Sequence, residues 1–513
     1  MSIAPAPRAG RREWIGLGII ALPCLLYSMD LTVLNLAVPR LSADLRPSST
    51  QLLWIVDIYG FVLAGLLIPM GALGDRIGRR KVLLVGAVVF GAASVLAAFS
   101  RSAAMLIGAR AILGVAGATI APSTLSLIRN MFLDARQRTT AISVWISSFS
   151  VGGSIGPLIG GVLLNHFWWG SVFLVGVPIM LLLLVLGPVL LPEFRDANAG
   201  RIDLLSALES LAAVLLVIYG VKRFAQGTAG TESVVCVAIG LVMAALFVRR
   251  QTNLTDPLID LRLFKLPSFS AALAAYTVAT FAGFGILLFI SQFFQGVRGL
   301  SPLVAGICMM PISLTFVVGS FLSPFLARRV GPAALMGAGM MVAVLGFLLL
   351  ARIGTDSGVA IVVTACVLYS LGLSPLFTLT TDMIVGAAPA ERAGAAAALS
   401  ETGSELGGAL GIALLGSIGA AAYRGAMARS LPLGLSSDAS TVARGTLGGA
   451  MTLAKSLPSG AEALIHAAQS AFCHSLNATA LSAAIVLAAA AVVITPRLAS
   501  AAALATSVPG RED

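Results

Sequence analysis

The stretch LLWIVDIYGFVLAGLLIPMGALGDRIGRRK, residues 52–81, decides the fold of this chain. Its first part is almost wholly apolar and approaches the roughly 20 residues of helix that cross the hydrocarbon core of a bilayer. A loop with glycines and four basic residues follows, and basic residues gather in the short cytoplasmic loops of membrane proteins. We therefore expect a membrane-spanning helix over 50–73 and a cytoplasmic turn directly after it.

The composition of the whole chain also indicates a membrane protein. Apolar residues make up 58% of the 513 residues, charged residues make up 11%, and the mean hydropathy is +0.98. Soluble domains carry about 25% charged residues, so we expect an integral membrane protein. The net charge of +11 could suggest nucleic-acid binding, but the arginines and lysines lie in short loops between apolar runs and not in one folded patch.

The remaining residue types exclude several classes of function. The five cysteines are scattered and the three histidines show no ligand spacing, so we expect neither a disulfide framework nor a metal site. The sequence has no GxxxxGK[ST] loop and no arguable Ser/His/Asp group, so we expect neither an ATP-driven pump nor an enzyme. No cofactor is expected, and a proton gradient would then supply the energy.

Fourteen apolar runs are long enough to span a membrane. The first is too long for the core of a signal peptide, so we expect it to be retained. With a cytoplasmic N-terminus, 21 of the 33 basic residues fall on the cytoplasmic side, which predicts that both termini are cytoplasmic. The expected helices are 14–38, 50–73, 82–100, 103–127, 139–163, 171–191, 203–221, 232–249, 268–294, 302–326, 333–351, 359–386, 393–420 and 475–495.

Two repeated features suggest that the chain contains two related halves. Gly78, after the second helix, aligns with Gly331 after the tenth, and VGGSIG at 151–156 aligns with LGGALG at 406–411 at nearly the same offset. This predicts a parallel-repeat transporter that handles its substrate between the halves. The expected division is an N-terminus at 1–13, a six-helix bundle at 14–191, two inserted helices at 203–249, a second six-helix bundle at 268–495 and a tail at 496–513.

The segment 421–474 is too polar to span a membrane. It contains two possible short helices, 438–456 and 459–472, separated by the turn sequence PSG. We expect an extracellular hairpin there, between the last two membrane helices.

The loop after the second helix resembles the signature that the major facilitator superfamily carries between its second and third helices. A glycine permits close helix approach, and an aspartate can lie against the positive N-terminus of a neighbouring helix. The alternative is a plain cytoplasmic turn with basic residues. The resemblance covers Gly71, Leu73, Asp75, Arg76, Gly78, Arg79, Arg80 and Leu83, and it implies a gating role for Gly71, Asp75, Arg76, Gly78 and Arg79.

Two further stretches extend the resemblance over essentially the whole chain. MDLTVLNLAVP at 29–39 is similar to the first-helix signature of the fourteen-helix drug:proton antiporters, and 52–81 is similar to their quaternary-ammonium and methyl-viologen efflux pumps. The implied fold is an all-α major facilitator fold of 14 helices in a 6 + 2 + 6 arrangement. GGSIGPLIGG resembles the antiporter motif of the superfamily, through Gly152, Gly156, Pro157, Gly160 and Gly161.

Three ionisable residues lie at similar depth in the outer half of the predicted helices: Asp30, Asp57 and Arg110. A charge at the centre of a membrane helix costs roughly 2.5–3.5 kcal/mol, and buried charges pair where they can. We therefore expect an ion pair between Arg110 and either Asp30 or Asp57. Arg110 and Gly114 also resemble the fourth-helix motif of the superfamily, which implies a role near proton transfer. We expect Asp30, Asp57 and Arg110 to take part in proton coupling or cation binding; a purely structural pair is the alternative.

Glu401 and Glu405 lie one turn apart, on one face of a predicted helix and near its middle. Burial and a like-charge neighbour both favour the neutral form of a carboxyl group. Such a group can take up and release a proton, and when ionised it attracts a lipophilic cation. Competition between proton and cation predicts antiport; a packing hydrogen bond or an interfacial position is the alternative.

Other residues are open to more than one interpretation. Asp382 lies near the cytoplasmic end of its helix, where an interfacial position is as good an explanation as a function. The helix 302–326 has no acid, which leaves the preference for divalent cations open. Aromatic and methionine side chains can line a cation cavity, although core or lipid packing is the usual role of each. The candidates are Trp54, Tyr59, Phe61, Trp145, Phe149, Phe284, Phe289, Met309 and Met310.

The function that the resemblance implies is proton-coupled export of hydrophobic, mainly cationic drugs and biocides, including quaternary ammonium compounds, dyes, biguanides and viologens. The expected setting is a bacterial cytoplasmic membrane, with a monomeric protein and no nucleic-acid partner. A dedicated metabolite exporter of the same fold and a transport-inactive membrane sensor are the alternatives. The deep ionisable residues disfavour the sensor, because each costs insertion energy.

Overall fold

A computed structural model describes residues 7–195, 203–225, 230–254, 257–431, 435–457 and 460–507. This part of the chain is helical throughout apart from its turns and connecting segments. Fourteen of its helical segments are long and apolar enough to cross a membrane. The all-α, fourteen-span prediction is therefore confirmed, and the chain is a multi-pass membrane protein.

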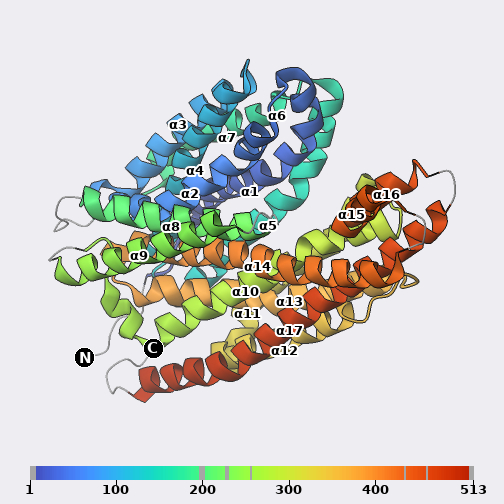
Figure 1. Cartoon of the computed structure of the whole chain (residues 1–513). Coiled ribbons are helices and arrows are strands. Elements are labelled where there is room, and N and C mark those ends of the chain that lie inside the picture. Colours follow the sequence, from blue (N-terminus) through green and yellow to red (C-terminus); the bar gives the residue numbers. More distant parts are fainter. Residues whose placement is uncertain are drawn as a thin grey trace.

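The first group of helices packs around one core. Arg110, Trp145 and Phe90 are fully or almost fully buried in it. Figure 1 shows these helices together on one side of the molecule. They are α1 (Arg11–Leu45), α2 (Ser49–Ile77), α3 (Arg79–Ala98), α4 (Ala103–Met131), α5 (Ala135–His166), the short α6 (Ser171–Leu174) and α7 (Gly176–Leu190). We call this group the N-terminal half.

A second group packs around its own core, on the other side of Figure 1, and we call it the C-terminal half. Its core is built mainly from alanine and leucine side chains. It consists of α10 (Pro267–Gln292), the π-helix η2 (Phe293–Val297), α11 (Pro302–Val330), α12 (Pro332–Leu350), α13 (Val359–Ala387), α14 (Ala393–Ser430) and α17 (Ala461–Ser507).

Two details are repeated in both halves. Gly78 joins α2 to α3 with φ +118°, and Gly331 joins α11 to α12 with φ +83°, a backbone region that favours glycine. In the N-terminal half, Gly152 of α5 lies against the backbone of α1 at Leu25; in the C-terminal half, the aligned Gly407 of α14 lies against the backbone of α10 at Thr277. The two sequence matches thus mark equivalent joints and equivalent helix contacts.

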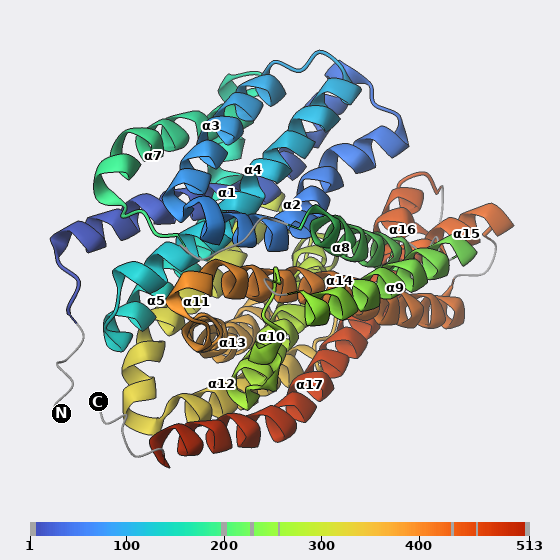
Figure 2. The same ribbon diagram turned by 90° about the vertical axis from the view of Figure 1, so that its left-hand side faces the viewer.

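Two helices, α8 (Leu204–Ala225) and α9 (Thr231–Asn253), lie between the halves in the chain and pack closely on each other. Helix α8 also packs against α2 and α14, one helix from each half, as Figure 2 shows. Gly65 of α2 provides the room, because a Cβ atom there would come within 2.5 Å of Leu211 on α8.

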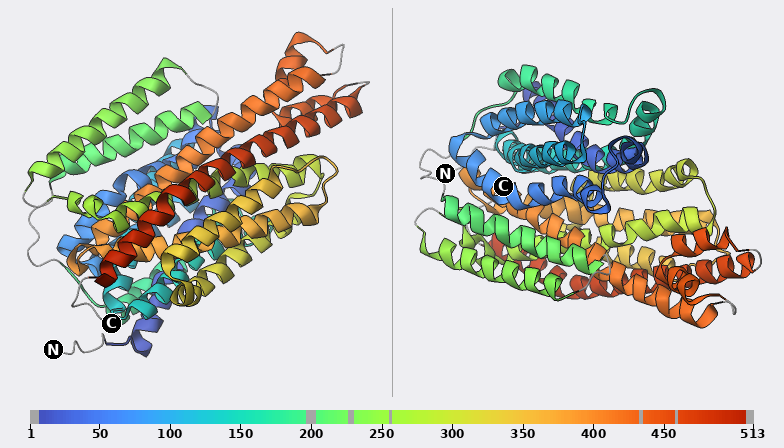
Figure 3. Two further views of the ribbon diagram at one scale, coloured as in Figure 1. Left: turned by 90° about the horizontal axis from the view of Figure 1, so that it is seen from below. Right: turned by 45° about the horizontal axis from the view of Figure 1, so that its top comes forward.

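The segment between α14 and α17 differs from its prediction. It holds two short helices, α15 (Ser437–Gly445) and α16 (Leu447–Ala454), in place of one helix over 438–456. The predicted separate helix at 459–472 is wrong: Ala461 begins α17, a continuous helix of 47 residues. Pro458 and Ser459 lie outside the described residues. Helices α15 and α16 lie at the end of the molecule opposite to the start of α1 and the end of α17 (Figures 1 and 3).

Candidate functional site

A buried ion pair lies in the N-terminal half between α1 and α4. Arg110 Nη1 lies 3.2 Å from Asp30 Oδ2; the arginine side chain is 1% exposed and the aspartate 12%. A second guanidinium nitrogen points to the Val56 carbonyl oxygen on α2, at 3.5 Å. The structure thus pairs Arg110 with Asp30, one of the two acids that the sequence had left open.

A row of aromatic rings extends from this ion pair. The guanidinium carbon of Arg110 lies 5.3 Å from the ring centre of Tyr59, which is itself 6.2 Å from the ring of Tyr27. Tyr27 meets Phe149 edge-on at 5.5 Å, and Phe149 meets Trp145 at 4.7 Å. The Trp145 indole N–H donates to Thr124 at 2.9 Å, so one end of the row is anchored by a hydrogen bond. The packing of these rings on one another fixes their positions beside the candidate acids.

The two acids of α14 take hydrogen bonds from tyrosines. Glu401 is 8% exposed and accepts a long hydrogen bond, 3.5 Å, from Tyr276 of α10 in the same half. Glu405 accepts a shorter one, 2.9 Å, from Tyr27 of α1 in the N-terminal half. The pair therefore lies where the two halves meet.

A second meeting point of the halves lies at the junction of α2 and α3. Asp75 is 5% exposed and accepts hydrogen bonds from the backbone N–H groups of Gly394 and Ala395, at 3.0 and 2.9 Å, in the first turn of α14. A helix N-terminus attracts an anion, so this contact joins the halves electrostatically. Gly71 permits it, because a Cβ atom there would lie 2.6 Å from the Gly394 carbonyl oxygen.

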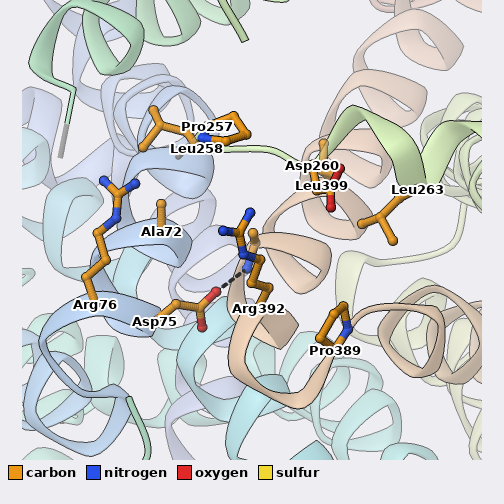
Figure 4. A pocket seen from close by; sticks show the side chains of 11 residues that line it. Ala72, Asp75, Arg76, Pro257, Leu258, Asp260, Leu263, Pro389, Arg392 and Leu399 are labelled. Carbon is orange, nitrogen blue, oxygen red and sulfur yellow. Dashed lines mark hydrogen bonds between the residues drawn. The ribbon is translucent and has the colours of Figure 1, made fainter. Parts of the chain in front are cut away.

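Arg79 completes this contact. It donates to Asp75 at 2.8 Å and to the carbonyl oxygens of Ala390 and Glu391, also at 2.8 Å, just before α14. We name Asp75, Arg79 and the segment 390–395 the clasp. Figure 4 shows a pocket beside it, with Arg76 pointing away from Asp75. The pocket holds about 30 Å³, enough for a water molecule and far less than a drug-sized ligand needs.

Asp382 forms a further contact between the halves at the same end of the molecule. Its two carboxylate oxygens accept hydrogen bonds from Arg138 and Thr139 at the start of α5, both at 2.6 Å. The sequence left Asp382 between an interfacial position and a function. The structure gives it a partner in the opposite half, and its helix α13 belongs to the C-terminal half.

The glycines of the predicted antiporter motif divide into two groups. Gly152, Gly156 and Gly160, spaced four residues apart, face α1, and a Cβ atom on any of them would collide with it. Gly161 has nothing within 4 Å of its Cβ position, so the structure gives it no packing reason. The side chain of Pro157 lies outside the described part. The motif therefore sets how closely α5 packs on the helix that carries Tyr27 and Asp30.

The other candidate lining residues do not form one wall. Phe61 is buried against α8, where it packs with Ile218 and Tyr219. Phe289 stacks on Phe472 of α17. Met309 packs against the C-terminal core, whereas three side chains are substantially exposed: Trp54 at 39%, Phe284 at 48% and Met310 at 47%. Among the lining candidates, Tyr59, Trp145 and Phe149 belong to the row that adjoins the acids.

These helices, with a clasp at one end and buried ionisable groups at mid-length, define a membrane transporter built from two similar halves. The Major Facilitator Superfamily model matches residues 20–412, and the chain belongs to that superfamily. It is 44% identical to the multidrug efflux pump LfrA of Mycolicibacterium smegmatis, over 95% of this chain and 96% of that one. It is 37% identical to the methyl viologen resistance protein SmvA of Salmonella typhimurium, over 92% and 95%.

Solved structures show the same fold. The human organic anion transporter MFSD10 aligns with a TM-score of 0.61 at 17% identity, covering 93% of this chain and 99% of that one. A bacterial homologue of the lysosomal transporter Spinster, in an inward-facing and unoccupied conformation, aligns with a TM-score of 0.59 at 18% identity, covering 96% and 99%.

Sequence reasoning missed the two tyrosines that hold the acids. Tyr27 carried one signal, since it precedes Asp30 by three residues and so shares its helix face. Tyr276 had no sequence feature that distinguishes it from other aromatic residues in apolar helices. Arg138 lies just before the predicted helix 139–163, and nothing in its sequence context indicates a partner in the opposite half.

Proposed function

We propose that this protein is a proton-coupled antiporter that exports hydrophobic, mainly cationic drugs and biocides, such as quaternary ammonium compounds, dyes, biguanides and viologens. It acts as a transporter and not as an enzyme. The observation that carries the proposal is the acid pair Glu401 and Glu405, held by tyrosine hydroxyls at the boundary between the halves. The similarity of the whole chain to a multidrug efflux pump and to a methyl viologen resistance protein supports this substrate class.

The mechanism follows from the chemistry of a buried carboxyl group. When ionised, it attracts a lipophilic cation in surroundings of low polarity; when protonated, it loses that attraction. A proton and a drug cation therefore compete for the same acids. If the acids bind the drug cation on one side of the membrane and the proton on the other, each transport cycle exchanges the two. Asp30 and Arg110 form an ion pair next to this site, and both groups stay charged.

The clasp controls which side of the membrane the site faces. Asp75 on α2 and the first turn of α14 belong to opposite halves, so the halves cannot separate at that end while these hydrogen bonds persist. The contact between Asp382 and Arg138 adds a second bond at the same end. We assign this end to the cytoplasm because most basic residues lie in loops there. The described arrangement is then closed toward the cytoplasm.

We further propose a division into two six-helix bundles, at 14–191 and 268–495, joined by an inserted pair at 203–249. The equivalent glycine joints at Gly78 and Gly331 support it. The setting is a bacterial cytoplasmic membrane, with both termini inside, α15 and α16 outside, and the protein as a monomer.

Efflux of ethidium from cells that express the chain, with and without a protonophore, tests this function. We expect export that stops when the proton gradient is dissipated. Undiminished efflux with the gradient dissipated would contradict proton coupling. Absence of ethidium efflux at confirmed expression would contradict the substrate class and favour a dedicated metabolite exporter.

A further inference from the structure

We propose that Tyr27 is a positioning residue for antiport. Its hydrogen bond to Glu405 joins the two halves, and the strength of this bond depends on whether Glu405 is ionised or protonated. This inference rests on the proposed function. Its basis is the hydrogen bond from the Tyr27 hydroxyl to Glu405 Oε1, 2.9 Å long, between residues 378 positions apart. Helix α1 packs on α5 and α7, and α14 packs on α10 and α17, so this bond crosses the boundary between the halves.

The ring of Tyr27 is rigidly placed on the N-terminal side. It is 7% exposed and lies between Phe149 and Tyr59 in the aromatic row. One turn further along α1, Asp30 is fixed by Arg110. The hydroxyl is therefore presented by a preorganised wall, and any adjustment of the bond falls on Glu405 and α14.

A tyrosine hydroxyl suits an acid that titrates. It can donate to a carboxylate and accept from a carboxylic acid, whereas an arginine can only donate. Hydrogen bonds to an ionised acceptor are about twice as strong as those between neutral groups. The Tyr27 contact therefore survives protonation of Glu405 but weakens, and a drug cation that approaches the carboxylate competes with the hydroxyl for the same oxygens.

Several charged or titratable groups surround this bond. On α1 they are Cys24 and Asp30, on α2 Tyr59, on α4 Arg110, on α10 Tyr276, and on α14 Glu401. Only Tyr27 among the tyrosines joins an acid of the opposite half through a hydrogen bond in the described part of the chain. A variant that removes its hydroxyl alone leaves all these groups in place.

The test measures ethidium-induced proton release by the purified full-length protein, as a function of pH, together with ethidium affinity. In Tyr27→Phe we expect the midpoint of release to move upward by about 1 pH unit, because the carboxylate loses a donor. At high pH the variant should bind ethidium as tightly as the wild type or more tightly, because the competing hydroxyl is gone. Fluorotyrosine at position 27, a stronger donor, should move the midpoint downward.

Two matched variants sharpen the result. Tyr369→Phe removes another buried hydroxyl, in α13, that has no hydrogen-bond partner in the described structure, so it should behave as the wild type. In a Glu405→Gln background, Tyr27→Phe should leave the midpoint of any remaining release unchanged. An unchanged midpoint in Tyr27→Phe, or the same shift with Glu405→Gln, would overturn the role of Tyr27 alone. No release from the wild type would overturn the proposed function, and this inference with it.

Discussion

The two halves of the molecule bury their acids beside different partners. In the N-terminal half, Asp30 lies against the guanidinium of Arg110, which is almost completely buried. In the C-terminal half, Glu401 and Glu405 are one turn apart and accept hydrogen bonds from Tyr276 and Tyr27.

The difference matters because the two kinds of partner tolerate different charges. Arginine stays protonated in proteins and only donates, so neutralising Asp30 would leave a buried cation without its counter-ion. A tyrosine hydroxyl keeps a hydrogen bond with either form of a carboxyl group. We therefore assign the fixed charge to the N-terminal half and the titrating charge to the C-terminal half.

The largest effect is expected for Asp30→Asn. Loss of the counter-ion of a fully buried arginine should lower the free energy of unfolding by about 3 kcal/mol and abolish drug efflux. Thermal unfolding of the purified protein and ethidium efflux measure the two effects. Asp30→Leu combined with Arg110→Leu should regain much of the stability without transport. If Asp30→Asn alone were stable and active, the fixed-charge assignment would be wrong.

Glu401→Gln and Glu405→Gln should show the opposite pattern. Each removes one of two neighbouring negative charges and keeps the shape, so unfolding should occur at the same or a higher temperature. Efflux should fall by about tenfold or more in at least Glu405→Gln, because the proton-binding group is gone. Efflux assays at equal expression, beside the unfolding curves, check both statements. Strong destabilisation by either variant would remove the distinction between the halves.

Asp75→Asn should have an intermediate effect, on cycling and not on binding. Losing the charge at the α14 N-terminus weakens the clasp by about 1 kcal/mol, which corresponds to a change of roughly fivefold in the equilibrium between the conformations open to either side of the membrane. The variant also removes the counter-ion of the buried Arg79, but that guanidinium keeps its hydrogen bonds to the carbonyl oxygens of Ala390 and Glu391, so the loss of stability should be smaller than for Arg110. Efflux should slow while ethidium affinity stays close to that of the wild type. Labelling of a cysteine introduced near the clasp would show increased access from the cytoplasm. Lost affinity would refute a gating role.

The inserted pair α8–α9 provides the smallest expected effect. Arg250 beside Asp203 donates a hydrogen bond at 2.6 Å and lowers the pKa of that carboxyl to about 2. A lowered pKa means that the contribution to stability is present above about pH 4 and is lost as the pH falls toward 2. Asp203→Asn should therefore lower the unfolding temperature slightly at pH 7, with a much smaller difference at pH 2. An equal difference at both pH values would exclude this ion pair as its cause.

Residues close in sequence were easier to predict than partners far apart. Helix spans follow from the length of apolar runs, and the partner of Arg110 could be narrowed to two acids because depth is set by position along a helix. The bond between Tyr27 and Glu405 depends on how the halves dock, which no local pattern encodes. The error at 459–472 arose because PSG and the polar residues after it indicated a separate element. The segment 461–472 is rich in alanine, which favours helix, and it forms the first part of the continuous helix α17.

That continuous helix has a mechanical consequence. At 1.5 Å per residue, the 35 residues of α17 that precede Pro496 make a rod of about 53 Å, well over the roughly 30 Å hydrocarbon core. A rod of this length that turns by about 10° around its middle moves each end by about 5 Å. The short helices α15 and α16 pack near one end of this lever, through contacts between α16 and α17. A fluorescent probe on α15 would consequently report transport movements with a larger displacement than one placed within the bilayer.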